Sequence, residues 1–279
     1  MNGFEKFVAW LQPTMTEPGM YGLFHIISLL LVIGITALLC WKCRSCSEKA
    51  FKWIIAGCWI FMVALEVYKQ LIFSMDVVDG KAVWDFEWYA FPFQLCSTPL
   101  YTLPLIAFCG GGKFRDSIIA YVCTFAMFGG LVTMFYPATV FTSLIGINIQ
   151  TMAHHGLQII LGIFILVHER KRLNLKFFIN GIYVFLAVFG IAMISNLIFH
   201  AISSETFNMF YISPYYETLF PLTIIYDVHY ALFIIAYPLG FTAAAFGVYC
   251  AQYYIIKAGM KERTTKEAVV LDAEEKTNE

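Results

Sequence analysis

Charged residues are scarce in this 279-residue chain, where Asp, Glu, Lys and Arg make up only 13% of the sequence. Soluble domains carry about 25%, so the chain lacks the polar side chains that cover a water-exposed surface. Hydrophobic residues account for 60%, and the mean hydropathy is +0.72. The formal net charge of −1 says little about partners, because the membrane topology controls where the charges lie; we expect no nucleic-acid partner. The composition predicts an all-α polytopic membrane protein.

The sequence also lacks a disulfide framework and a recognisable metal motif. Most of the eight cysteines lie in apolar runs, where a free thiol behaves as a small hydrophobe. Cys40, Cys43 and Cys46 form C-x-x-C-x-x-C, but a fourth ligand and a supporting loop are missing. A cytosolic thiol cluster or an acylation site fits these three better. We therefore expect no metal and no cofactor.

Long apolar runs fill most of the chain, and each is long enough to cross a hydrocarbon core of about 30 Å. They predict a bundle of about seven transmembrane helices. The expected spans are 20–41, 53–75, 88–109, 115–136, 141–167, 176–200 and 222–256. The last is long enough to tilt or to kink at Pro238.

Basic residues alternate between the connecting segments and give an orientation. Of the 18 Lys and Arg, fifteen fall on one side of the predicted spans and only Lys6 and Lys81 on the other. The positive-inside rule then places the N-terminus outside and the C-terminus in the cytoplasm. The expected parts are an extracytoplasmic interfacial segment (1–19), a seven-helix transmembrane domain (20–256) and a charged cytoplasmic tail (257–279). Because the sequence has no N-x-S/T sequon, we expect a multi-pass protein of a bacterial plasma membrane.

Polar side chains within the predicted spans share one depth, toward the outer side. Such groups are costly in a bilayer and are by default functional. Their common depth predicts a single cavity open to the outer leaflet or the outside. They are His25, Glu66, Lys69, Gln70, Gln94, Cys96, Asn148, Gln150, His154, His155, Gln158, Asn196, His200, Asp227 and His229.

The fifth predicted span carries the densest polar pattern. Asn148, Thr151, His155 and Gln158 follow helical spacing and form one stripe. His154 points about 100° away from His155 on a helix but shares a flank with Gln158. Two adjacent histidines in mid-bilayer have no obvious packing purpose, so the pair favours a functional role.

Other polar residues have structural interpretations of equal or greater weight. Glu66 and Lys69, three residues apart, can form a structural ion pair. His25 and His200 lie near helix ends, where hydrogen bonds to the backbone would satisfy them. Asn196 can join two helices by a hydrogen bond.

Cys96 is the only cysteine at the depth of the polar residues. Pro92 and Pro99 flank it, so we expect a broken or kinked helix with free backbone N–H groups that could hold an oxyanion. A thiolate is the nucleophile in cysteine chemistry, and a histidine can take its proton. Asp227 or Glu66 could orient that histidine. The pattern predicts an acyl-thioester intermediate whose acyl chain passes to an alcohol or to water.

Three alternatives remain open at this stage. A zinc site could use the two adjacent histidines, His229, Asp227 and Cys96, although no H-E-x-x-H motif occurs. A proton-coupled or small-molecule transporter could use Glu66, Lys69, a histidine and Asp227 as a relay, but the inner halves of the spans lack polar groups. A non-catalytic protein could bind a lipid in the same cavity.

Two short motifs carry a family resemblance, which extends over most of residues 20–256. "FPFQLC" in the third predicted span and "HHGLQIILG" in the fifth, with the N-out layout, resemble the YwaF-type integral membrane proteins, bacterial relatives of transmembrane protein 164. The family pattern is Pro, an apolar residue, any residue and Leu-Cys in one helix, with a histidine pair in another. Phe91 and Phe93 stand where smaller aliphatic residues are expected.

The resemblance implies a chemistry. The animal member is regarded as a phospholipid acyltransferase with a cysteine nucleophile, which implies that role for Cys96 with a histidine partner and membrane lipids as substrates. We therefore expect an acyltransferase or acyl hydrolase that uses Cys96 and His155, with His154 in support. The expected supporting or cavity residues are Gln94, Glu66, Lys69, Asn148, Gln158, His200, Asp227 and His229.

Overall fold

The computed structural model describes residues 2–203 and 206–278, with side chains through residue 259. In this part of the chain, six helices are long and apolar enough to cross a membrane. They are α2 (Leu23–Cys43), α3 (Glu48–Ser74), the continuous run Lys113–Phe135, α7 (Ile145–His168), α8 (Leu175–Ile202) and the Tyr230–Gly259 part of α10 (Tyr230–Asn278). The predicted all-α polytopic membrane bundle is confirmed.

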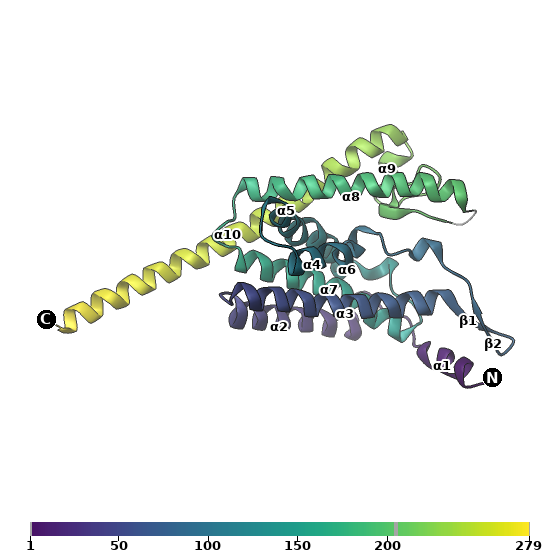
Figure 1. Ribbon diagram of the computed structural model, residues 1–279, viewed down its shortest axis with the longest axis horizontal. Helices are drawn as coiled ribbons and strands as arrows, with labels where there is room; N and C mark the ends of the chain where they lie inside the picture. Colours follow the sequence, from purple (N-terminus) through teal and green to yellow (C-terminus); the bar gives the residue numbers. More distant parts are fainter. Residues whose placement is uncertain (1, 204–205, 279) are drawn as a thin grey trace.

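The helices run side by side, and the two ends of the chain lie at opposite ends of the bundle (Figure 1). One end, called here the hairpin end, carries α1 (Gly3–Leu11) and the antiparallel strands β1 (Met75–Val78) and β2 (Lys81–Trp84). At the other, the tail end, α10 extends beyond the other helices. Because the six long helices are an even number, the partly helical segment 88–108, which includes a shorter apolar helix, supplies the additional crossing that brings the two termini to opposite ends.

The small hairpin is a local feature that the apolar pattern did not predict. Its turn is Asp79-Gly80, with φ of 51° and 74°. Asp-Gly tolerates positive φ at both positions and favours a tight two-residue turn. The Asp-Gly pair between "MDVV" and "KAVW" is therefore the sequence signal for this hairpin.

The third predicted span is helical over only part of its length. Instead of a helix over 88–109, the chain forms a 3₁₀ turn, η1 (Trp88–Ala90), an irregular stretch, a second 3₁₀ turn, η2 (Leu95–Ser97), and the short helix α4 (Pro99–Phe108). The last predicted span also begins later. Residues Thr223–Tyr226 form a separate helix, α9, before α10 starts at Tyr230.

The remaining elements are short. The run Lys113–Phe135 comprises α5 (Lys113–Tyr121), the π-helical η3 (Val122–Ala126) and α6 (Met127–Phe135). Two further 3₁₀ turns, η4 (Pro137–Thr139) and η5 (Met209–Tyr211), lie in connecting loops.

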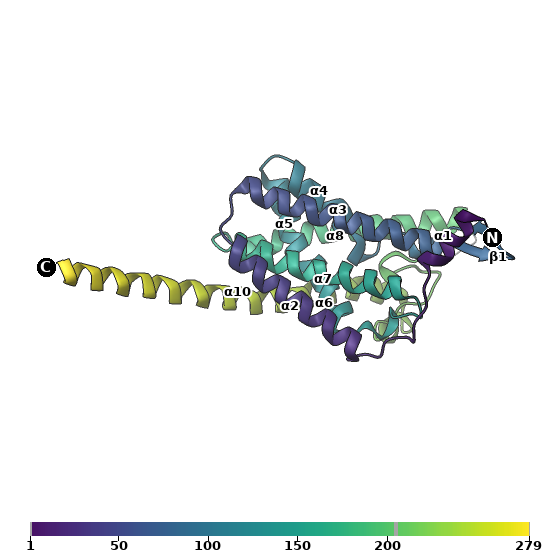
Figure 2. The same cartoon turned by 90° about the horizontal axis from the view of Figure 1, so that it is seen from below.

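Helix α7 is the centre of the bundle, because 83% of its most apolar 18-residue stretch is buried. It packs against α2, α3 and α6 (Figure 2). Glycines permit the close approach: a Cβ on Gly156 would lie 2.5 Å from Val32, and one on Gly162 would lie 2.5 Å from Met127. Small residues at helix contacts are typical of membrane bundles. The histidine pair, on α7, is consequently in the interior.

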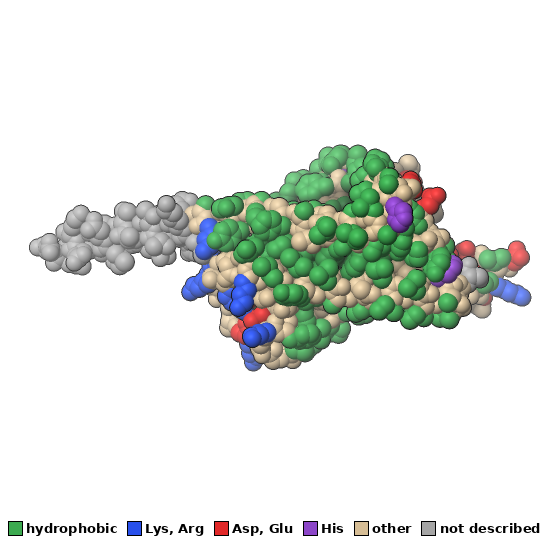
Figure 3. Space-filling view, turned by 90° about the horizontal axis from the view of Figure 1, so that it is seen from above, with side chains coloured by type: hydrophobic (Ala, Val, Ile, Leu, Met, Phe, Trp, Pro, Cys, Tyr) green, Lys and Arg blue, Asp and Glu red, His purple; other side chains and the backbone are tan. Residues whose placement is uncertain are grey.

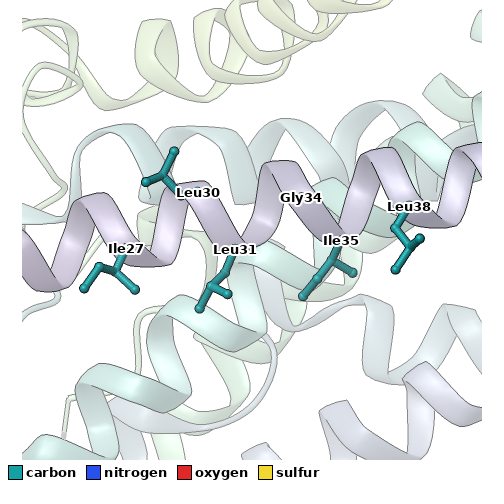
Figure 4. A pocket seen from close by; sticks show the side chains of 6 residues that line it. All are labelled: Ile27, Leu30, Leu31, Gly34, Ile35 and Leu38. Atoms are coloured by element: carbon teal, nitrogen blue, oxygen red, sulfur yellow. The ribbon is translucent and has the colours of Figure 1, made fainter.

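The outside of the bundle is apolar. Figure 3 shows hydrophobic side chains over the body and most of the visible Lys and Arg side chains near the end where α10 extends. A shallow hollow of about 330 Å³ lies along α2 and is lined by Ile27, Leu30, Leu31, Gly34, Ile35 and Leu38. Figure 4 shows the side chains that line it. With no polar side chain, this hollow offers only the surface that acyl chains of a membrane contact.

Candidate functional site

The stretch before Cys96 is irregular because its prolines prevent a continuous helix. Pro92 fixes its own φ and biases Phe91 toward an extended backbone, and Phe91 has a ψ of 134°. The chain then forms one 3₁₀ turn around Cys96, and α4 starts at Pro99. Irregular backbone at membrane depth is tolerated only where protein or a cavity surrounds it. The predicted break at Cys96 is therefore present as a defined 3₁₀ turn.

Pro99 has a second consequence, at the carbonyl of Cys96. A continued 3₁₀ turn would bond this oxygen to the N–H of residue 99, which proline lacks. Instead, the Nε2 groups of His154 and Gln158 donate to it, at 3.0 and 2.7 Å. Two side chains of α7 thus hold Cys96 in place through its main chain.

Other side chains satisfy the remaining freed carbonyls of this segment. Pro104 cannot donate to the carbonyl of Leu100, and Trp59 Nε1 of α3 does so at 2.9 Å. Tyr101 donates to Pro92, and Gln70 to Ala90, at 2.9 and 2.8 Å. Side chains of α3, α4 and α7 therefore replace the missing helical hydrogen bonds.

This replacement predicts a measurable coupling between Trp59 and Pro104. Trp59→Phe removes the donor to the Leu100 carbonyl, so we expect the free energy of unfolding to fall by about 1–3 kcal/mol. Pro104→Ala restores the helical N–H donor, and the same Trp59 substitution should then cost about 1 kcal/mol less. Thermal unfolding of the four purified proteins measures this cycle, and strictly additive effects would contradict it.

On its other side, Cys96 borders an apolar pocket of about 450 Å³ between α6, the loop 210–222 and α10. Phe128, Phe233 and Tyr237 belong to its wall. The exposed side chains of Val132 and Phe220 also line it, so the pocket opens to the outside of the bundle. The volume lies within the usual range for small-molecule sites, about 300–1,000 Å³. Cys96 is a free thiol here.

Free backbone donors lie next to this thiol. Within the described residues, the N–H groups of Leu95 and Cys96 have no main-chain acceptor, because they begin the 3₁₀ turn, and the Cys96 N–H points to its own thiol. Adjacent main-chain N–H groups beside a nucleophile are the usual donors to an oxyanion. In the part of the chain that the structure describes, neither N–H group takes part in a backbone hydrogen bond, as the proline break led us to expect.

A polar cluster lies on the α3 and α7 side of Cys96. Lys69 Nζ is 2.9 Å from Glu66 Oε1. Lys69 is within electrostatic range of Cys96, His154 and His155. The two imidazole centroids are 5.4 Å apart. The five residues form one cluster in the interior.

The two histidines have different hydrogen bonds. His155 Nδ1 donates to the Thr151 carbonyl at 2.8 Å, which leaves Nε2 as the unprotonated nitrogen. His154 uses Nε2 as its donor, and its Nδ1 is buried without a partner. In the described structure, no hydrogen bond joins the Cys96 thiol to either ring.

Several of the predicted site residues instead tie the backbone together. Gln94 donates to the Asn208 carbonyl and accepts from the Phe210 N–H, at 2.9 and 2.7 Å, and so holds the loop that covers the Cys96 pocket. Asn148 accepts from the main-chain N–H of Thr142 and donates to its carbonyl. His25 and Asn196 also bond to main-chain groups. The shared depth of the polar residues therefore arises from structural ties as well as from the Cys96 cluster.

The remaining predicted residues lie apart from Cys96. Asp227 and His229 are exposed, and His229 accepts from the N–H of Ala231 close by. His200 stacks on Tyr215, with ring centroids 3.5 Å apart. None of the three hydrogen-bonds to Cys96 or to the histidine pair in the described part of the chain. Glu66, bonded to Lys69 and Gln70, is the only predicted orienting acid within this cluster.

Sequence patterns missed the pocket wall opposite Cys96. The adjacent glycines Gly129 and Gly130 of α6 are the one available signal. A Cβ on Gly130 would lie 2.8 Å from the His155 carbonyl and the Gln158 Cβ, so this glycine lets α6 lie directly on the histidine helix. In the described residues, no group of three or more His, Cys, Asp or Glu could hold a metal ion.

Comparison with protein-family models gives a match to the TMEM164 family over residues 20–249. The chain belongs to the TMEM164 family. The resemblance inferred from "FPFQLC" and the histidine pair is thus confirmed. No curated protein and no solved structure matches the chain. The matched range of this TMEM164-family protein contains all of the Cys96 pocket and the polar cluster behind it.

Proposed function

We propose that this TMEM164-family protein transfers acyl chains of membrane lipids through a thioester on Cys96. The observation that carries the proposal is the position of Cys96. This residue lines an apolar pocket that is open to the outside of the bundle, and His154 and Gln158 hold its main-chain carbonyl. An acyl chain fits the apolar pocket by its chemistry. In this proposal the polar cluster behind Cys96 supplies the proton-transfer groups.

The first step is thioester formation. The Cys96 sulfur attacks the carbonyl carbon of a lipid ester, and His155 Nε2 takes the thiol proton. The N–H groups of Leu95 and Cys96, which have no main-chain acceptor among the described residues, stabilise the oxyanion of the tetrahedral intermediate. The carbon–oxygen bond then breaks, and the proton passes from His155 to the departing alkoxide.

The second step releases the acyl chain. A hydroxyl oxygen attacks the thioester carbon, the carbon–sulfur bond breaks, and the hydroxyl proton ends on the Cys96 sulfur. His154 and Gln158 act as positioning residues, because they hold the Cys96 carbonyl and do not touch the acyl group. His155 is preferred as the base because its Nδ1–H is fixed by Thr151 and its Nε2 is available.

The placement in the cell follows from the charges. Lys and Arg gather at the tail end (Figure 3), so we place that end in the cytoplasm and the hairpin end outside a bacterial plasma membrane. In this placement residues 1–19 lie along the outer surface, and residues 257–279 are the cytoplasmic tail. The Cys96 pocket then faces the outer half of the bilayer.

A direct test is detection of the thioester. The full chain is reconstituted with a phospholipid that carries an alkyne-tagged acyl chain, and the peptides are analysed by mass spectrometry. We expect a hydroxylamine-labile acyl group on Cys96 and none on Cys58, which lies outside the pocket. Lipid bound in the pocket without any adduct on Cys96 would instead favour a non-catalytic lipid-binding protein.

Filling the pocket should change the preferred chain length. Gly240 lines the pocket, and a Cβ there would meet no atom within 4 Å, so the leucine side chain of Gly240→Leu starts from open space. We expect turnover of a hexadecanoyl lipid to fall about tenfold or more, since a fit that is wrong by one methylene group in an apolar pocket costs about 1–3 kcal/mol. Turnover of an octanoyl lipid should change less.

The matched control is Gly247→Leu, two turns further along α10. It lies in open space outside the pocket lining and is exposed. The Gly247→Leu protein should turn over both the hexadecanoyl and the octanoyl lipid at the unmodified rate. Equal losses for both chain lengths in Gly240→Leu would contradict acyl binding in this pocket.

A further inference from the structure

A second pocket lies on the opposite side of the segment that carries Cys96. Its volume is about 350 Å³, and it is lined by α3, β2 and both ends of the 92–101 stretch. Pro92 and Tyr101 face this pocket, whereas Gln94 and Cys96 face the first one. The short Cys96 segment thus separates two pockets.

Two buried acceptors of this pocket have no hydrogen-bond partner. They are Glu66 Oε2 and Gln70 Oε1. Glu66 is only 7% exposed. An unsatisfied buried acceptor costs about 1–3 kcal/mol, and more when it is charged, so native structures rarely leave two side by side.

The donors nearby are already used on other atoms. Lys69 Nζ and Gln70 Nε2 both bond to Glu66 Oε1, at 2.9 and 2.7 Å. Gln70 Nε2 also donates to the Ala90 carbonyl. Among the described residues, no donor reaches Glu66 Oε2 or Gln70 Oε1. Because both residues line the pocket, a ligand there can supply the donor.

The charge of the cluster selects the kind of donor. Lys69 already balances the Glu66 carboxylate, and a second cation beside Lys69 would be repelled at short range. A neutral hydroxyl avoids this cost and still donates a hydrogen bond to a charged acceptor.

The rest of the pocket is apolar and aligned with α3. Glu66 and Gln70 lie toward the hairpin end, and Trp59 lies seven residues deeper, about 10 Å along the helix. Val63 and Leu100 line the space between. A hydroxyl at Glu66 with an alkyl chain running toward Trp59 matches this arrangement.

We infer that this second pocket binds a membrane amphiphile by its free hydroxyl, which donates to Glu66 Oε2 and Gln70 Oε1. Resting on the proposed function, the inference makes this hydroxyl the acyl acceptor: its oxygen bonds to the acyl carbon, the carbon–sulfur bond breaks, and its proton ends on the Cys96 sulfur. Cys96 lies between Pro92 and Tyr101 in the chain, and these two residues line the second pocket beside Glu66. The protein would then be a transferase with separate donor and acceptor pockets.

Binding is tested by quenching of tryptophan fluorescence. The full chain in vesicles of a single phosphatidylcholine is titrated with decanol brominated at the chain end, and separately with its methyl ether. The two probes share the quencher and the chain, but only the alcohol donates a hydrogen bond. We expect stronger quenching by the alcohol, and Trp59→Phe should remove that excess.

Substitution of Glu66 and Gln70 tests whether these two residues accept the hydrogen bond of the hydroxyl. The measured quantity is the alcohol concentration at which the additional quenching, relative to the methyl ether, is half-maximal. The Gln70→Met protein and the Glu66→Leu, Lys69→Leu double variant should each raise this concentration about tenfold. Ile60→Met, on the exposed face of the same helix, is the matched control and should leave it unchanged. Equal quenching by alcohol and ether in the unmodified protein would mean that water satisfies both acceptors and would overturn the inference.

A second readout separates this inference from the proposed function. With decanol as acceptor, Gln70→Met should accumulate the Cys96 adduct and release less decyl ester. Absence of any adduct in the unmodified protein refutes the thioester and leaves the quenching result standing. Normal ester release by Gln70→Met and by the Glu66→Leu, Lys69→Leu protein refutes the acceptor pocket and leaves the thioester standing.

Discussion

Replacement of Cys96 by alanine is expected to abolish lipid acyl transfer, with a loss on the order of 10³-fold or more. Loss of a covalent nucleophile has effects of this size or larger in other acyl-transfer enzymes. No other described cysteine lines the Cys96 pocket, so no thiol can substitute. Transfer of a tagged acyl chain between two lipids in vesicles measures the loss.

The fold should survive this substitution. His154 and Gln158 bind the main-chain carbonyl of residue 96, which alanine retains. We therefore expect an unchanged elution profile and a thermal midpoint close to that of the unmodified protein. Cys58→Ala is the matched control, because Cys58 is also a partly buried thiol of a membrane helix. Full lipid turnover by Cys96→Ala would refute the thioester mechanism.

Cys96→Ser adds a second, graded test. Serine keeps the shape of the side chain but is a much weaker nucleophile at neutral pH without strong activation. We expect the hydroxylamine-labile adduct to disappear while lipid still occupies the pocket. A stable oxygen ester on Ser at this position would show that the surrounding groups activate either nucleophile.

The family and the membrane class could be predicted from sequence because both depend on local patterns. Apolar run length gives the spans, and "FPFQLC" with the histidine pair gives the family. Pro92 and Pro99 also predicted the break at Cys96, since a missing N–H acts on its own turn of chain. These signals do not require knowledge of which helices are neighbours.

The pocket and the role of each polar residue required the tertiary structure. Depth alone grouped Cys96 with Asn148 and Asn196, yet those amides bond to loop backbone. Asp227 has the correct chemistry for an orienting acid but is exposed, because α10 begins only at Tyr230. Helix rotation and loop paths decide these contacts, and neither has a short-range sequence signal.

Prolines also explain why α7 carries so many polar groups. A carbonyl freed by Pro99 in a membrane interior must find a donor from another helix, and both His154 and Gln158 meet that need. One histidine of the pair therefore has a sufficient structural reason to exist. The other, His155, bonds only to its own helix and has no such reason.

This difference leads to the second large effect, at His155. His155→Gln is expected to slow thioester formation by about 10²–10⁴-fold, the usual contribution of a general base. Glutamine keeps a polar side chain near the Thr151 carbonyl but cannot accept and return a proton. The rate of adduct formation on Cys96, measured in a single turnover, reports this step directly.

The matched variant is His154→Gln, in the adjacent position of the same helix. A glutamine amide can still donate to the Cys96 carbonyl, and Gln158 remains bonded to it. We expect a loss of less than about tenfold, because His154 positions Cys96 without taking its proton. The unmodified and His154→Gln proteins should both slow as pH falls and His155 becomes protonated, whereas the slow His155→Gln protein should lack this dependence. If His154→Gln carried the larger loss and removed the pH dependence, His154 would be the base and His155 a packing residue.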